Sequence, residues 1–175
     1  MDELTFYLAG PCFSSAERRW NSDLCIALIN YCDGMGFNFY LPQDHVQESW
    51  SSEKISAELT RGLIASDGVI ANLDGPGGDD GTCWEMGFVA GMNAMALRLG
   101  RSILIPRSIF WYRTDFRRGG DSLDNVNLMM AHNAKKIVLD GTSVPMVASS
   151  IQKALVRVHG TRPKPLFATS APNCS

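Results

Sequence analysis

The sequence predicts a single α/β domain in which a five-stranded parallel sheet carries helices on both faces. Strand and helix patterns alternate along the chain, which is the signature of parallel strands joined by crossover helices. A length of 175 residues, with 45% hydrophobic and 19% charged residues, suits one globular domain with an ordinary core. We expect this domain to span residues 1–158. A flexible tail is expected over residues 159–175, which contain three of the eight prolines.

Three strands and two helices are predicted in the first part of the chain. The pattern Ser14-x-x-Glu17 is a capping box, and apolar residues recur behind it at helical spacing, so a helix is expected after the first strand. A second helix is expected after the polar loop at residues 42–52, because apolar residues again share one face. The three strands are expected at residues 4–9, 37–41 and 68–72.

Two long irregular segments separate the remaining elements. Residues 73–81 are rich in glycine and aspartate and are predicted to form a loop after the third strand. The connection at residues 107–134 is unusually long, which in a compact domain indicates a functional or mobile loop, and residues 123–130 within it are expected to form a short helix. The other helices are expected at residues 82–97 and 143–158, and the other strands at residues 102–106 and 136–139.

The composition argues against several kinds of partner. A formal net charge of −2 and a pI near 5.9 give no long-range attraction to nucleic acid or to anionic membranes, so neither is expected as a partner. The N-terminal residues lack the basic region of a signal peptide, and no apolar stretch reaches the roughly 20 residues of a membrane span. Five cysteines form no C-x-x-C pair, and His45, His132 and His159 have no metal-ligand spacing. We therefore expect a cytoplasmic protein without a metal site.

The unusual loop residues follow the ends of the first three predicted strands. In open parallel sheets, ligands bind in the crevice beyond the carboxyl ends of the strands. The segments GPCF at residues 10–13, PQDH at residues 42–45 and the acidic segment at residues 74–85 all follow such ends. Neither the G-x-G-x-x-G fingerprint nor the G-x-x-x-x-G-K-[ST] phosphate loop is present, so NAD and ATP are not expected and no cofactor is indicated.

Glu85 is open to two interpretations. In the first, Thr82-x-x-Glu85 is a capping box, and the carboxylate only reaches back to a backbone N–H. In the second, Glu85 begins a helix beside Asp79 and Asp80, and the helix N-terminus keeps its carboxylate ionised as a nucleophile. A cluster of carboxyl groups suits cleavage of a glycosidic bond, in which one carboxyl attacks the sugar and another protonates the leaving group.

Four short segments carry the most specific pattern of the sequence. They are FYLAGPCF at residues 6–13, ASDGVIANLD at residues 65–74, DDGTCWEMG at residues 79–87 and NVNLM at residues 125–129. In this order and spacing they resemble the nucleoside 2-deoxyribosyltransferase family, and the resemblance spans residues 4–140. The expected domain is then flavodoxin-like. The resemblance implies transfer of 2-deoxyribose between purine or pyrimidine bases, with a deoxynucleoside and a free nucleobase as partners and no cofactor.

The resemblance also implies roles for individual residues. Glu85 would be the nucleophile, Tyr7 the hydroxyl that orients it, and Asp79 the proton donor. Further implied contacts are Asp67 and Asp79 to the base, Phe13 as an apolar wall, Gly10 in the first loop, and Asn127 and Met129 from a neighbouring subunit. Family members place a base-contacting glutamine near the position of Val46, where this sequence offers Gln43 or Gln47. A homo-oligomer with shared sites, a dimer or a multiple of dimers, is expected.

Three other functions stay open. Attack by water instead of a second base would give an N-glycoside hydrolase of deoxynucleosides or of their 5'-monophosphates. Residues 10–13 contain no Arg or Lys, and Pro11 lacks an N–H, which favours a nucleoside without phosphate. Residues 76–82 with Glu85 are similar to the PGG-x-GT-x-x-E motif of phosphoribohydrolases, but they contain one residue too many. A non-catalytic nucleotide-binding module is the third alternative, because fold alone does not settle function.

Overall fold

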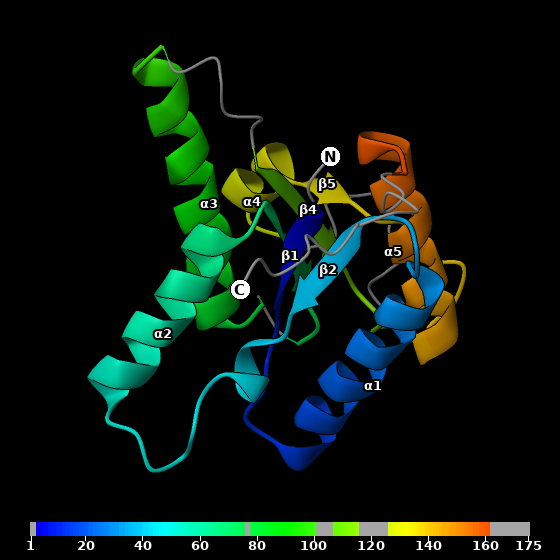
Figure 1. The fold of residues 1–175 in the computed structure, drawn as a ribbon, viewed down its shortest axis with the longest axis horizontal. Helices are drawn as coiled ribbons and strands as arrows, with labels where there is room; N and C mark the ends of the chain where they lie inside the picture. Colours follow the sequence, from blue (N-terminus) through cyan, green and yellow to red (C-terminus); the bar gives the residue numbers. More distant parts are fainter. Residues whose placement is uncertain (1–2, 76–77, 101–106, 116–125, 162–175) are drawn as a thin grey trace, which may run out of the picture.

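In the computed structural model, which describes residues 3–75, 78–100, 107–115 and 126–161, the chain forms one five-stranded sheet (Figure 1). The strands are β1 (Leu4–Ala9), β2 (Phe37–Tyr40), β3 (Gly68–Asn72), β4 (Ser108–Tyr112) and β5 (Lys135–Lys136). The helices are α1 (Ser15–Tyr31), α2 (Ser52–Ala65), α3 (Asp80–Arg98), α4 (Leu128–Asn133) and α5 (Val144–His159), with a 3-10 turn at Pro42–Asp44. Every strand pair is parallel, and the order β2-β1-β3-β4-β5 is flavodoxin-like, so the predicted fold class is confirmed. No helix in these ranges is long and apolar enough to cross a membrane.

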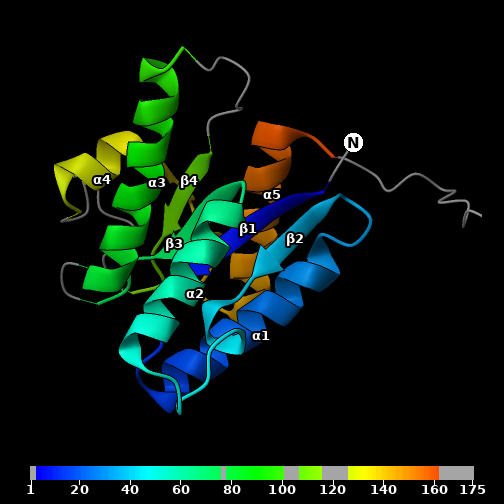
Figure 2. The same ribbon diagram turned by 60° about the vertical axis from the view of Figure 1, so that its left-hand side comes forward.

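The helices cover the two faces of the sheet as separate layers. α1 and α5 pack together on one face, whereas α2, α3 and α4 lie on the other (Figures 1 and 2). Side chains alternate along β1, so Phe6 enters the core under α1 and α5, and Tyr7 enters the core under α2 and α3. Both side chains are fully buried. The sheet therefore presents Tyr7 to the same face as α3, the helix that carries Glu85.

The fourth strand of the sheet lies later in the chain than predicted. The predicted segment, residues 102–106, is outside the described residues, and β4 is formed by Ser108–Tyr112 within the predicted long connection. Phe110 packs into the core under α1 and α5, whereas Trp111 packs into the core under α2 and α3. This alternation of large apolar side chains is that of a strand buried on both faces. β5 is also shorter than predicted and begins one residue earlier, at Lys135.

The start of α3 corrects one interpretation of Glu85. Asp79 is the N-cap residue, because its carboxylate accepts hydrogen bonds from the Thr82 N–H at 2.8 Å and from the Thr82 hydroxyl at 2.9 Å. The helix thus begins two residues earlier than predicted, and Glu85 lies in its second turn, where its carboxylate bonds to Tyr7 instead of to a backbone N–H. The proposed Thr82-x-x-Glu85 capping box is therefore wrong. The capping box predicted at the start of α1 is confirmed.

The loops that follow β1, β2 and β3 meet at one edge of the sheet. Because the strands are parallel, their carboxyl ends at Ala9, Tyr40 and Asn72 point to the same edge, in the lower part of Figure 1. α1, α2 and α3 all begin from this edge. It is the edge at which open parallel sheets bind their ligands.

Candidate active site

A tyrosine and a glutamate from different elements form the centre of the site. The Tyr7 hydroxyl on β1 donates a hydrogen bond to Glu85 Oε1 on α3 over 2.5 Å. Tyr7 is fully buried, and a buried hydroxyl requires a partner, which Glu85 supplies. Short hydrogen bonds to a carboxylate are among the strong ones. Tyr7 therefore fixes the orientation of the half-buried Glu85 side chain.

Burial controls the ionisation of both groups. It raises the pKa of Glu85 to about 7; the Tyr7 hydrogen bond opposes this shift, and the negative charge of Asp79 adds to it. Burial, with the nearby charge of Glu85, also raises the pKa of Tyr7 above its ordinary value, so the hydroxyl stays protonated as a donor. The expectation that the helix N-terminus keeps Glu85 ionised is thus corrected, because the charge of a helix end fades beyond the first turn. At neutral pH, both forms of Glu85 are populated.

A cleft of about 420 Å³ opens between the start of α1 and the loop that joins β3 to α3. Its apolar wall consists of Pro11, Phe13, Ala16 and Trp20, and its polar residues are Glu17, Asn21, Asn72, Asp74 and Asp79. Asp79 connects the cleft to the Tyr7–Glu85 pair, because it lines the cleft and its charge acts on the Glu85 pKa. No Lys or Arg lines the cleft within the described part of the chain. The cleft thus has the size of a small-molecule site and an acidic character.

Asp74 holds the segment after β4 against the wall of the cleft. The Thr114 N–H and hydroxyl each donate to one of its carboxylate oxygens at 2.6 Å, and the Asp115 N–H donates at 3.1 Å. The Asp74 N–H in turn donates to Asn72 Oδ1 at 3.0 Å. The sequence placed Asp74 in the acidic segment expected at this edge, but Asn72 was given no role. The position of Asn72 at the end of a buried strand was the signal that could have identified it.

The structure brings together five of the residues expected in the site. Tyr7 and Glu85 form the hydrogen-bonded pair, and Asp79 and Phe13 line the cleft. Phe13 is 73% exposed at the wall of the cleft. A Cβ added to Gly10 would lie 3.2 Å from a side chain at the end of β3. The absence of a side chain at Gly10 therefore lets the first loop pack closely against that strand.

Two residues expected to contact the base are placed differently. Asp67 precedes β3, at the amino edge of the sheet, where its carboxylate accepts the Thr5 N–H at 2.8 Å. This edge is opposite to the one that carries the cleft, so the expectation of a base contact from Asp67 is corrected. Gln43 lies at the carboxyl edge, but its amide nitrogen donates to the Arg18 carbonyl and the Ser22 hydroxyl, both at 2.9 Å. Gln43 thus ties the turn after β2 to α1.

Asn127 and Met129 lie at α4, outside the cleft. Asn127 caps the helix by accepting the Met129 N–H at 2.9 Å, and Met129 is 72% exposed. Met129 lines an apolar pocket of about 380 Å³ between α3 and α4, together with Met86 and Met130. Within one subunit neither Asn127 nor Met129 lines the cleft. Their expected role requires a second subunit and stays a prediction.

The domain is flavodoxin-like, with a half-buried carboxylate and an acidic cleft at the carboxyl edge of its sheet. These features define a class of α/β proteins that bind small molecules at that edge. Within this class, the chain belongs to the nucleoside 2-deoxyribosyltransferase family, whose model matches residues 6–132. Family membership implies an enzyme of the nucleoside deoxyribosyltransferase type, which acts on small nucleosides and nucleobases.

Several solved structures share the fold. A conserved protein from Enterococcus faecalis V583 is 24% identical, with a TM-score of 0.59, and the match covers 87% of this chain and 99% of that chain. A 2-deoxyribosyltransferase from Bacillus psychrosaccharolyticus is 16% identical, with a TM-score of 0.55 and coverage of 92% and 99%. The 2-deoxyribosyltransferase from Leishmania mexicana is 20% identical, with a TM-score of 0.55 and coverage of 89% and 99%. No curated protein matches the chain.

Proposed function

We propose that this protein transfers 2-deoxyribose from one nucleobase to another by a retaining double displacement in which Glu85 is the nucleophile. The observation that carries the proposal is the 2.5 Å hydrogen bond from Tyr7 to Glu85 beside an acidic cleft. Membership of the family supports the reaction class independently of this geometry. No cofactor enters the reaction.

In each displacement, one bond to C1' of the sugar forms and another bond to C1' breaks. In the first, Glu85 Oε2 attacks C1', because Oε1 accepts the Tyr7 hydroxyl. The C1'–N bond breaks and its electron pair stays on the base. Asp79 takes up the proton that Glu85 loses when it ionises, and passes this proton to the departing base. In the second, a nitrogen of the incoming base attacks C1' of the deoxyribosyl ester, Glu85 leaves as a carboxylate, and the proton of the incoming base returns to Asp79. Two inversions at C1' give net retention.

Asp79 is suited to the role of proton donor by the way it caps α3. Both of its bonds to Thr82 use Oδ2, so Oδ1 is left for a ligand in the cleft that Asp79 lines. The charge of Asp79 also raises the pKa of Glu85, so the two carboxyl groups lie near each other. We propose that the two carboxyl groups flank a single site, as cleavage of a glycosidic bond requires.

The charge of the cleft supports a nucleoside without a 5'-phosphate as the substrate. Glu17, Asp74 and Asp79 line the cleft, and no described Lys or Arg does. A phosphate dianion would be repelled by these carboxylates and would find no cationic partner among the described residues that line the cleft. Hydrolysis of a deoxynucleoside 5'-monophosphate is therefore the less favoured alternative.

Incubation of the protein with deoxyinosine and free adenine is expected to yield deoxyadenosine and hypoxanthine, because the ester on Glu85 is intercepted by the second base. Liquid chromatography of the mixture over time measures both products. Inosine is the matched control and is expected to react far more slowly, since ribose forms the cationic sugar species less readily than deoxyribose. Free base without new nucleoside would indicate a hydrolase, and no turnover would favour a binding module.

The rate of base exchange is expected to fall as the pH drops through about 7, since Glu85 must be ionised to attack and burial raises its pKa to about 7. The profile of kcat/KM between about pH 5 and 9 measures this acid limb. Tyr7→Phe removes the hydrogen bond that lowers the Glu85 pKa, so its acid limb should lie at higher pH. A wild-type limb near the ordinary carboxyl value of 4.5, or an unmoved limb in Tyr7→Phe, would contradict this assignment.

We also propose that the subunits assemble as a dimer or a multiple of dimers, and that Asn127 and Met129 of one subunit complete the site of another. The support comes from the surface of α4. The adjacent large apolar side chains of Leu128 and Met129 are both exposed there. Exposed apolar patches usually mark contact surfaces.

The proposed enzyme is cytoplasmic and is built on one domain over residues 1–158, with residues 159–175 as a tail. α5, the last described helix, ends at His159. The four cysteines in the described ranges, Cys12, Cys25, Cys32 and Cys83, are all free thiols. Free thiols suit a reducing compartment, which supports the proposed location.

A further inference from the structure

Three aromatic rings are stacked in a row behind the Tyr7–Glu85 pair. Tyr7 on β1 and Tyr40 on β2 are direct partners in the parallel register, and their rings are stacked with centroids 5.3 Å apart and planes 13° apart. The His45 ring is stacked on Tyr40 in turn, with centroids 4.0 Å apart and planes 6° apart. The row therefore connects an exposed loop histidine to the buried hydroxyl that contacts Glu85.

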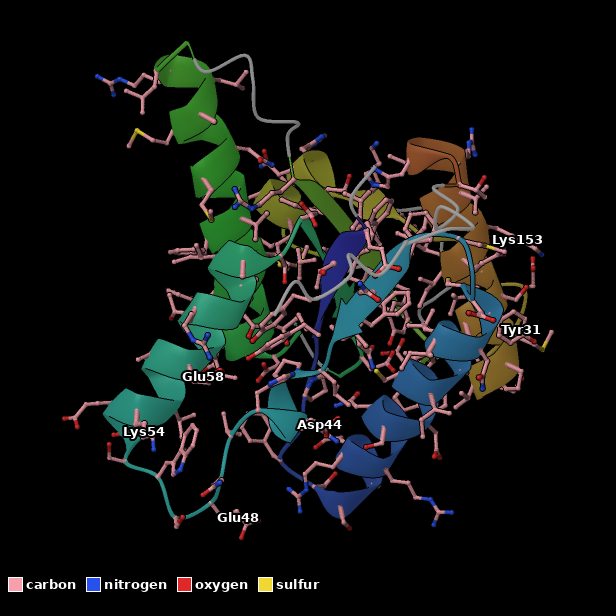
Figure 3. The ribbon with its side chains drawn as sticks, viewed as in Figure 1. Tyr31, Asp44, Glu48, Lys54, Glu58 and Lys153 are labelled. Atoms are coloured by element: carbon pink, nitrogen blue, oxygen red, sulfur yellow. The ribbon has the colours of Figure 1, made fainter. Side chains whose placement is uncertain are left out.

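Tyr40 is also fixed from the side of α2. A Cβ added to Gly62 would lie 2.3 Å from Cζ of the Tyr40 ring, so the ring lies directly on the backbone of the helix. The Tyr40 hydroxyl is 3.5 Å from Oε1 of Glu58, which is labelled on α2 in Figure 3. Glu58 is itself held by Arg61 at 2.6 Å. The ring is thus confined by α2 as well as by Tyr7 and His45.

We infer that Tyr40 is a positioning residue for the proposed reaction: its confined ring holds the Tyr7 hydroxyl on the carboxylate of Glu85. The inference rests on the proposed function. β1 fixes the backbone of Tyr7, but the hydroxyl lies at the far end of a side chain with two torsion angles. A hydrogen bond of 2.5 Å tolerates little displacement of its donor. Packing against the Tyr7 ring is therefore what keeps the hydroxyl in place, and Tyr40 supplies this packing from β2.

The Glu85 pKa can report whether the Tyr7 hydrogen bond is intact, because the charged groups near the aromatic row are unchanged by a substitution of Tyr40. Glu58, Arg61 and His45 lie around Tyr40, whereas Asp79 lies near Glu85. Removal of the Tyr40 ring takes away no charge. A rise in the Glu85 pKa after this removal would report the loss of the Tyr7 hydrogen bond, because water entering in place of the ring would lower this pKa.

Two substitutions of Tyr40 separate its ring from its hydroxyl. Tyr40→Leu is expected to lower kcat about tenfold, with KM changed less than about twofold, and to move the acid limb up by about one pH unit, because the Tyr7 hydroxyl is no longer held. Tyr40→Phe keeps the stack and is expected to behave as wild type. Tyr31→Leu, at the exposed end of α1 away from the site (Figure 3), is the matched control and should change none of these values.

The inference also predicts which substitutions depend on one another. In a Tyr7→Phe background, Tyr40→Leu should move the acid limb no further, because the hydroxyl that Tyr40 positions is already absent. An additive shift, or an unmoved limb in a folded Tyr40→Leu variant, overturns the inference. If Tyr40→Leu does not fold, Gly62→Ala displaces the ring instead and should raise the Glu85 pKa. An unchanged pKa in Gly62→Ala then overturns the inference.

A direct titration of Glu85 separates this inference from the proposed function. The infrared carboxyl band that disappears in Glu85→Gln reports the Glu85 pKa without any turnover. A raised Glu85 pKa in Tyr40→Leu supports the positioning role even if no deoxynucleoside reacts, in which case the proposed function alone fails. If the wild type exchanges bases but the Glu85 pKa is the same in the wild type and in Tyr40→Leu, only the positioning role is refuted.

Discussion

Glu85→Gln is expected to lower the rate of base exchange at least about a thousandfold while the fold is kept. Glutamine has the size of glutamate and still accepts the Tyr7 hydroxyl, but its amide does not form the deoxyribosyl ester. The initial rate of deoxyadenosine formation from deoxyinosine and adenine measures the loss. Glu53→Gln, in the exposed first turn of α2, is the matched control and should keep the full rate. A folded Glu85→Gln variant with more than about one tenth of the wild-type rate would exclude Glu85 as the nucleophile.

The same substitution is expected to stabilise the protein above neutral pH. The pKa of Glu85 is about 7 in the folded protein against an ordinary value of 4.5, so the folded state binds more protons between these values. The stability that protonated Glu85 contributes is fully present below pH 4.5, the ordinary pKa, and is lost as the pH rises through the folded-state pKa of about 7. Glu85→Gln removes this loss, which amounts to at most about 3 kcal/mol of unfolding free energy. Thermal unfolding should therefore show a larger gain in Tm near pH 8 than near pH 5, whereas equal gains would argue against a raised pKa.

The strands could be predicted where the apolar pattern was plain, and were misplaced where basic residues interrupted it. β1 and β3 lie at the residues expected for them. The segment of β4 was assigned to a long connection, because Arg107 and Arg113 flank it in the sequence. Basic residues beside Trp111 and Tyr112 are more typical of a polar loop than of a buried strand. β5 consists of Lys135–Lys136, so it has no apolar pattern that could reveal it. Lysines on an edge strand prevent it from pairing with other chains.

Most of the candidate site depends on relations that no local pattern contains. Asp67 and Asp79 both flank β3 in the sequence, but only a residue that follows the strand reaches the edge where ligands bind. The raised pKa of Glu85 depends on burial by elements distant in the chain. Tyr40 meets Tyr7 only through the parallel register of β1 and β2, so its role could not be inferred before the pairing was known.

The exposed surface of α4 favours the proposed shared site over a self-contained subunit. If Leu128 and Met129 served only to cover their own sheet, both would be buried, but they are 58% and 72% exposed. Asn127 orients this segment by capping the helix through the Met129 N–H. Methionine adapts to irregular contact surfaces, and self-complementary patches usually produce closed symmetric assemblies. These features support the proposal that the segment enters the site of a neighbouring subunit.

Two inactive proteins, Glu85→Gln and the double variant Asn127→Ala/Met129→Ala, are accordingly expected to regain activity when their subunits are exchanged. In a hybrid dimer, the intact Glu85 of one chain meets the intact Asn127 and Met129 of the other, so one of its two sites is complete. Random exchange of equal amounts makes about half of the dimers hybrids, which gives about one quarter of the wild-type activity. The rate of deoxyadenosine formation measures the recovery after dilution and reassociation, with exchange followed by mass spectrometry of differently labelled subunits. Each variant exchanged with itself is the control and should stay inactive. Sedimentation of the wild type as a fully active monomer, or demonstrated exchange without recovery, would show that each subunit builds its site alone.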